Sequence, residues 1–458
     1  MNSLKKVGTA IVGRLADKSS EEEKTRLRSA PATKYEQLDE GSGRQNFEIE
    51  PGTPSSSPAP PEDRGNLCYL AFFSLGTGVL FPWNAFITAV DYFQYLYPNE
   101  HVDRVFSVAY MLPNLMILGL LLVHDLNLTS SSRIYSGFVL YLFCLFSVPL
   151  VDLIFIGGDI GTQGTWNFTV AAVFLAGLAD GVAQGSIFGT AAVLPPRCTQ
   201  AVVSGTSVSG VVISLLRVLT KAVIPQDEDG LRLGSYLYFG VAGAFCLFCI
   251  FVQAFLGKLP LFAHYLMSDK GSGAHHHHHD TAGQSADKVS SIGSILRRTW
   301  PLGSGLFLSY AVTLSIFPGF LAEDVESETL GDWYAILLIL GFNITDFVGK
   351  SSPIFERFRM RKDLGLFAFA LTRSAFYPLY IMATSGPRVL RTEPLGPAYV
   401  TVLTLILGFS NGWLTANCLM EAPDKVRARD AEKTEMLMVW FLLLGLLIGA
   451  LLGWLWLL

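Results

Sequence analysis

The sequence predicts an all-α polytopic membrane protein with eleven transmembrane helices, six before its longest connector and five after it. Of its 458 residues, 51% are hydrophobic and 16% are charged, and the mean hydropathy is +0.41. Soluble domains carry about 25% charged residues. The sequence also contains repeated apolar runs, and each is about as long as the roughly 20 residues that a helix needs to span a bilayer. This combination argues against a soluble globular fold.

The expected helices follow the apolar runs, and the polar stretches between them define the domains. Residues 1–66 form a tail whose Ser/Pro-rich run, PGTPSSSPAPP, is typical of a disordered segment. Helices one to six occupy 67–257, a flexible loop occupies 258–300, and helices seven to eleven occupy 301–458. The individual spans are 67–90, 105–124, 134–156, 168–194, 201–222, 235–257, 301–322, 332–355, 364–384, 397–420 and 436–457.

Basic residues in the connectors predict the orientation. The even-numbered connectors carry most of the loop Lys and Arg residues, whereas several odd-numbered connectors are acidic. Cytosolic loops are enriched in Lys and Arg. We therefore expect the tail and the 258–300 loop in the cytosol, and the C-terminus outside the cell or in a lumen. The plasma membrane is the expected location, with a vacuolar or endosomal membrane as the alternative.

Two short patterns in these cytosolic segments have weak functional interpretations. Tyr35-Glu-Gln-Leu38 fits a tyrosine-type sorting motif, although so short a pattern often arises by chance. Five consecutive histidines, His275 to His279, suit metal binding, but no acidic or cysteine partners flank them at a defined spacing. We interpret them as a tolerated insert, and expect no metal site, no cofactor and no nucleic-acid partner.

The run 332–355 contains the most informative pair of residues. Asp346 lies near its middle and Lys350 follows four residues later, so both share one helix face. A charge at mid-bilayer costs about 2.5–3.5 kcal/mol on insertion scales, and such residues usually face a bundle interior or a water-filled cavity. The pair predicts a functional site, with an ion pair that only satisfies itself as the alternative.

Further polar residues lie inside the fourth, fifth and ninth spans. Asp180 and Gln184 share one face of the fourth span, where interhelical hydrogen bonding is the alternative to a functional role. Arg217 in the fifth span is a candidate partner for Asp180, and Arg373 in the ninth is a second candidate partner for Asp346. Glycines recur every four residues in the fourth span, and such a stripe lets a neighbouring helix approach closely.

The sequence contains no catalytic motif, so we expect a transporter and not an enzyme. Two helical halves with polar residues at mid-depth are typical of secondary transporters. Five stretches resemble the equilibrative nucleoside transporter family, and the chain looks most like its plant branch. They are LGTGVLFPWNAFITA, AQGSIFG, VSGTSVSG, DFVGK and LGFSNGWLT.

The resemblance implies a 6+5 pseudo-symmetric, major-facilitator-like arrangement that works as a monomer. It implies facilitative transport by alternating access of nucleosides such as adenosine, uridine, guanosine and cytidine, with nucleobases as a further class. Asp346 and Lys350 would then hold the ribose hydroxyls, and Gln184 would hydrogen-bond the base. The other pocket residues that the resemblance implies are Leu80, Trp83, Met111 and Ser186.

Three alternatives stay open. Asp180 and Asp346 are carboxylates within apolar runs, so they are candidates for proton coupling in a nucleoside symporter. A membrane receptor or scaffold would use the same fold without transport. A transporter for a different small solute would use the same polar helix faces for other chemistry.

Overall fold

A computed structural model of the chain describes residues 61–124, 128–157, 160–265, 291–317, 321, 327–390, 392 and 394–453. The sorting pattern at Tyr35 and Leu38 and the run His275 to His279 lie outside these ranges. Within them, every regular element is a helix. The all-α class that the composition predicts is therefore confirmed.

The helices follow the predicted order. The first half contains α2 (Leu67–Thr88), α3 (Val90–Leu96), α4 (Val102–Val123), α5 (Ser130–Val151), α6 (Gln163–Ala192), α7 (Pro196–Val223) and α8 (Glu228–Leu256). The second half contains α10 (Ile292–Ile316), α12 (Trp333–Ser351), α13 (Asp363–Thr372), α14 (Phe376–Ser385), α15 (Leu395–Glu421) and α16 (Ala431–Leu452). The predicted ninth span is divided into α13 and α14 by a 3-10 turn at Arg373–Ala375. Pro378 lies in the first turn of α14, where its missing backbone N–H leaves no helical hydrogen bond unmade.

Ten helices in the described ranges are long and apolar enough to cross a membrane, and α10 is not among them. α10 begins at Ile292, inside the stretch assigned to the 258–300 loop. The hydroxyl of Ser291 caps it by accepting a hydrogen bond from the Ser294 backbone N–H at 3.4 Å. The helix therefore begins before its apolar run, and the start of the membrane span at residue 301 stays a prediction. The count of eleven spans stays a prediction.

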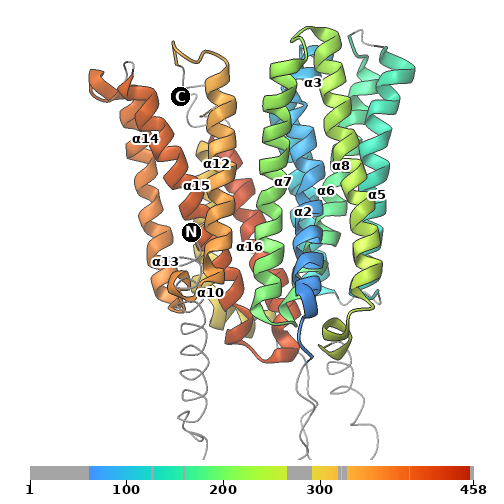
Figure 1. The fold of residues 1–458 in the computed structure, drawn as a ribbon, viewed down its shortest axis with the longest axis vertical. Coiled ribbons are helices and arrows are strands. Elements are labelled where there is room, and N and C mark those ends of the chain that lie inside the picture. Colours follow the sequence, from blue (N-terminus) through green and yellow to red (C-terminus); the bar gives the residue numbers. More distant parts are fainter. Residues whose placement is uncertain are drawn as a thin grey trace, which may run out of the picture. The chain divides into compact units, whose positions relative to one another are not determined.

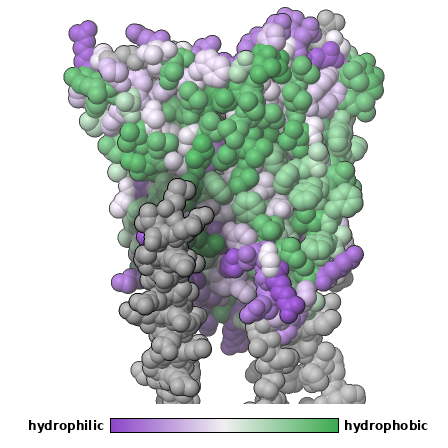
Figure 2. All heavy atoms as spheres, in the orientation of Figure 1, coloured by the Kyte–Doolittle hydropathy of each residue, from purple (hydrophilic) through white to green (hydrophobic). Residues whose placement is uncertain are grey.

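The outer surface of the helices is apolar. Val223 exposes 80% of its surface and Phe155 exposes 71%, and many Leu, Ile and Phe side chains on other helices are similarly exposed. Figure 2 shows hydrophobic side chains over the middle of the visible face, with hydrophilic side chains at its upper rim and at the lower helix ends. Monomeric soluble proteins rarely expose apolar patches of this kind. The chain is an integral multi-pass membrane protein.

The two halves meet along two seams. Within the first half, α2 packs on α7, and α6 packs on α4 and α5; within the second half, α12 packs on α15, and α10 packs on α16. α7 and α12 run side by side between the halves (Figure 1, green and orange), and α16 contacts α4 and α6. The contact between Pro196–Val223 and Trp333–Ser351 is called the α7–α12 seam below.

The glycine stripe of the fourth span brings a neighbouring helix close, as predicted. A Cβ on Gly181 would lie 2.2 Å from Cγ2 of Ile117 and 2.7 Å from the carbonyl oxygen of Asn114, both on α4. A Cβ on Gly177 would lie 2.2 Å from the carbonyl oxygen of Tyr110. Only hydrogen fits at these positions. The stripe therefore sets α6, with Asp180, directly against α4.

Candidate functional site

Asp346 and Lys350 form the centre of a buried polar cluster on α12. Lys350 Nζ lies 2.9 Å from Asp346 Oδ2, as their spacing of four residues predicts. Each residue exposes 5% of its surface. A buried ion pair is favourable only when further hydrogen bonds satisfy its remaining atoms. The pair therefore requires partners from other helices.

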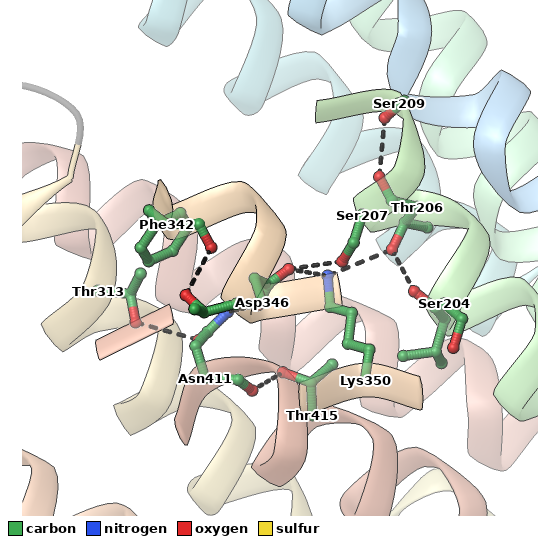
Figure 3. A network of polar contacts seen from close by, with 12 residues as sticks. Ser204, Thr206, Ser207, Ser209, Thr313, Phe342, Asp346, Lys350, Asn411 and Thr415 are labelled. Carbon is green, nitrogen blue, oxygen red and sulfur yellow. Dashed lines mark hydrogen bonds and ion pairs between the residues drawn. The ribbon is translucent and has the colours of Figure 1, made fainter. Parts of the chain in front are cut away.

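Two hydroxyls reach the ion pair from α7, across the α7–α12 seam. Ser207 Oγ donates to Asp346 Oδ2 at 2.5 Å, and Lys350 Nζ donates to Thr206 Oγ1 at 3.3 Å. Figure 3 shows both hydroxyls pointing from α7 toward the pair. The first half of the chain thus completes an ion pair that belongs to the second half.

Asn411 on α15 supplies the third donor to the carboxylate. Its Nδ2 donates to Asp346 Oδ1 at 2.8 Å. The next residue, Gly412, permits this contact, because a Cβ there would lie 2.1 Å from the Asp346 carbonyl oxygen. Asp346 therefore accepts hydrogen bonds from a hydroxyl, an ammonium group and an amide.

Arg373 lies behind Asn411 and does not contact Asp346 directly. Its Nη1 donates to Asn411 Oδ1 at 3.2 Å, and its Nη2 donates to Thr313 Oγ1 at 2.7 Å. The expected direct pair of Arg373 with Asp346 is wrong, because the Asn411 amide stands between the two charges. No carboxylate in the described ranges forms an ion pair with Arg373. Asp346 therefore pairs directly with one buried cation, Lys350, and is linked to the second, Arg373, only through the Asn411 amide.

Asp180 is the centre of a second polar group, in the first half. Asn114 Nδ2 donates to Asp180 Oδ2 at 2.6 Å, and Asp180 exposes 1% of its surface. Asp180 Oδ1 and Gln184 Oε1 are buried without a hydrogen-bond partner among the described residues. The expected pairing of Arg217 with Asp180 is wrong. Arg217 pairs with Asp91 on α3, because it lies near the α3 end of α7 and not at the depth of Asp180.

The aromatic and apolar candidates lie on α2 and α4. The ring centroids of Trp83 and Tyr110 are 4.6 Å apart, which joins the two helices. Leu80 is half-buried on α2, and Met111 is buried on α4. These side chains are apolar or aromatic and lie on two helices that contact each other; their role beside a flat ring system stays a prediction.

Ser186 occupies a different environment. It is buried, and its hydroxyl donates to the carbonyl oxygen of Val182 on its own helix at 2.7 Å. Within the described ranges, Gln184 makes no hydrogen bond to Asp346 or Lys350. The predicted site residues therefore form two groups, one in each half of the chain.

Comparison with known proteins identifies the kind of protein that carries this site. The profile described as "Nucleoside transporter" matches residues 170–458. The chain belongs to the nucleoside transporter family. Two relatives from Arabidopsis thaliana are similar over nearly the whole chain. "Equilibrative nucleotide transporter 1" is 40% identical over 86% of this chain and 87% of its own, and "Equilibrative nucleotide transporter 8" is 40% identical over 86% and 96%.

Solved structures agree on the fold of this nucleoside transporter. The proton:xylose symporter XylE, of the major facilitator superfamily, aligns with a TM-score of 0.58 at 10% identity, over 85% of this chain and 88% of its own. A bacterial homologue of the iron transporter ferroportin aligns with a TM-score of 0.52 at 12% identity, over 85% and 91%. The protein is a nucleoside transporter with a major-facilitator-like fold, as the resemblance implied.

Four residues of the two polar groups are not among the predicted site residues, and Thr206, next to Ser207, is one of them. Asn411 lies in the LGFSNGWLT stretch and Ser207 in VSGTSVSG. Both stretches are interpreted as matches to the family or as a helix face of small residues, and no polar residue in them is predicted to bind Asp346. Asn114 appears beside Pro113 in the second span without any periodic signal. A polar residue inside an apolar run, on a helix that also carries close-packing glycines, is the signal that marks Ser207 and Asn411.

Proposed function

We propose that the protein moves nucleosides by alternating access, with the ribose bound at Asp346 and Lys350. The observation that carries this proposal is a buried ion pair at the α7–α12 seam, where the two halves meet. Substrate sites of such transporters lie between the halves near mid-membrane. Rocking of one half against the other would expose this seam to each side in turn.

The chemistry of the two polar groups fits the two ends of a nucleoside. A carboxylate accepts hydrogen bonds from hydroxyl donors, which suits the ribose at Asp346. The amide of Gln184 both donates and accepts, which suits the polar edge of a base. Its Oε1 is buried without a partner in the described part of the chain, so it has an acceptor to offer. Trp83 and Leu80 would flank the ring.

We place the transporter as a monomer in the plasma membrane, with its N-terminal tail in the cytosol. The basic connectors on one side of the helices support this orientation. Protease protection of tags at the two ends of the chain tests it. A tail tag that is cut from outside intact cells would contradict the orientation.

Uptake of radiolabelled uridine by purified protein in liposomes tests the function. Protein-dependent uptake that unlabelled adenosine, guanosine and cytidine inhibit is the expected result. Uracil, ribose and uridine monophosphate in the same competition panel show whether the base, the sugar and a 5′-phosphate are each recognised. Inhibition by an unrelated solute alone would favour another substrate class.

Gln184→Ala is expected to raise the apparent KM for adenosine about fivefold or more, since an unpaired polar edge costs about 1–3 kcal/mol. Gln253→Ala is the matched control. Gln253 is also buried, but it bonds to Ser131, away from both polar groups. An unchanged KM for purines and pyrimidines in Gln184→Ala would remove Gln184 from the binding site.

Proton-coupled symport is the second candidate function, because Asp180 is a buried carboxylate that forms no ion pair in the described ranges. The groups that face it are Asn114 on α4 and the phenols of Tyr110 and Tyr141. In a symporter, Asp180→Asn would abolish acceleration by an inward proton gradient and spare exchange at equal pH. Wild-type uptake that does not respond to the gradient would reject this function.

A further inference from the structure

The polar contact between Ser207, Thr206 and the ion pair has the chemistry of a bound diol. Two hydroxyls on consecutive residues of α7 bond to Asp346 and Lys350 (Figure 3). Ribose presents two hydroxyls on neighbouring carbons. The α7 hydroxyls therefore hold the positions at the ion pair that the proposed function gives to the substrate.

We propose that the hydroxyls of Ser207 and Thr206 act as internal substitutes for the ribose hydroxyls. They satisfy the ion pair when no nucleoside is bound, and they leave it when a nucleoside binds. This inference rests on the proposed function. It adds what the bound ribose would displace, namely the contact of Ser207 with Asp346 and that of Thr206 with Lys350.

Competition follows from the number of acceptor positions at the carboxylate. An ionised carboxylate accepts at about four lone-pair positions. Three donors already occupy Asp346: Ser207, Lys350 and Asn411. Two incoming hydroxyls exceed the remaining capacity, so at least one donor has to leave. Ser207 is the donor that comes from the other half of the chain.

The other two donors are held in place. Lys350 lies on the same helix as Asp346, and Asn411 lies on α15, which packs closely on α12. A Cβ on Gly412 would lie 2.1 Å from the Asp346 carbonyl oxygen, and one on Gly408 would lie 2.6 Å from that of Phe342. α12 and α15 therefore approach each other backbone to backbone, whereas the hydrogen bonds between α7 and the ion pair on α12 are made by side chains. We expect α7 to be the helix that separates when a nucleoside binds.

The remaining contacts of the seam suit such a separation. Ser351 Oγ donates to Ser204 Oγ at 3.2 Å, and Asn343 Nδ2 donates to Ser214 Oγ at 2.8 Å. Neutral bonds of this kind are individually weak in membrane proteins. The charge-assisted contacts at the ion pair, from Ser207 to Asp346 and from Lys350 to Thr206, are the ones that a nucleoside would replace. Lys221 makes a further contact at the other end of the seam, where its Nζ donates to the Asp332 carbonyl oxygen and lies over the Trp333 ring.

The contacts of Ser207 and Thr206 with the ion pair have a consequence for the transport cycle. A facilitative transporter has to return empty after each delivery, and an unsatisfied ion pair in a closed seam is costly. The α7 hydroxyls remove that cost. Exchange does not depend on them, because the transporter carries a nucleoside in both directions.

The test measures net uptake of uridine into empty liposomes and exchange at equal uridine concentrations on both sides. We expect Ser207→Ala to lower net uptake at least about fivefold, in line with the loss of a hydrogen bond to a charged group, and to leave exchange within about twofold. The apparent KM for uridine in exchange should fall, since the internal competitor is gone. Thr206→Val should change the ratio of exchange to net uptake in the same direction.

Ser214→Ala is the matched control, because it removes a seam hydroxyl that does not bond to the ion pair. We expect it to leave the ratio of exchange to net uptake unchanged. An equal loss of net uptake and exchange in Ser207→Ala, or an unchanged ratio in both Ser207→Ala and Thr206→Val, would overturn the proposal. If Ser207→Ala does not fold, Thr206→Val and Ser207→Cys decide. Wild-type protein that transports no nucleoside would instead overturn the proposed function.

Discussion

Asp346→Asn is expected to lower uridine uptake about a hundredfold, because it weakens two charge-assisted hydrogen bonds that contribute about 1.5–3 kcal/mol each. The side chain keeps its size but becomes neutral. Uptake of 2′-deoxyuridine should fall less, since that substrate has one ribose hydroxyl fewer to lose. The measurement compares initial rates for the two substrates at equal amounts of protein in the membrane.

A second variant separates binding from folding. Asp346→Asn leaves Lys350 and Arg373 as buried cations without a carboxylate in the described cluster, and such a change costs about 3–5 kcal/mol. Asp346→Asn/Lys350→Met removes one of these cations, so its abundance and thermal stability should recover. Uridine uptake should stay low. If the double variant regains uridine transport, the carboxylate serves folding and does not bind the sugar.

Asn411→Leu is expected to lower uridine uptake at least about tenfold, because an amide that bonds to charged groups contributes about 1.5–3 kcal/mol per bond. Asn411 Nδ2 donates to Asp346, and Asn411 Oδ1 accepts from Arg373. Leu fills the same space and offers neither function. Ser410→Ala is the control on the neighbouring position, since Ser410 bonds only to a carbonyl of its own helix among the described residues.

A double-mutant cycle shows whether Arg373 acts through Asn411. An arginine donates only and a carboxylate accepts only, so the two charges together orient the Asn411 amide. We therefore expect Arg373→Met to lower uptake in the wild-type background and to add little in the Asn411→Leu background. Independent, additive losses would mean that Arg373 stabilises the fold of α10, α13 and α15 without positioning Asp346.

Local patterns in the chain were sufficient for most of the fold. Apolar runs located the helices, because in a bilayer every backbone polar group has to be satisfied within its own segment. The apolar runs located the helix ends less well than the helices themselves. α10 begins before its apolar run, because its first turn is polar and is capped by the Ser291 hydroxyl. Spacing along one helix was equally informative. It placed Asp346 beside Lys350, and the glycine stripe against a neighbour, since both follow from helical geometry alone.

The sequence by itself determined the membrane class, the two halves and the charged pair on the eighth expected helix. The tertiary structure alone decided the partners of that pair. Ser207 and Asn411 lie far from Asp346 along the chain, and only the close packing of α7 and α15 on α12 brings them to the carboxylate. The same reason explains why Arg217 pairs with Asp91 and why Arg373 reaches Asp346 only through an amide. Charge predicts that a buried group needs a partner, whereas the depth and rotation of each helix select which one it finds.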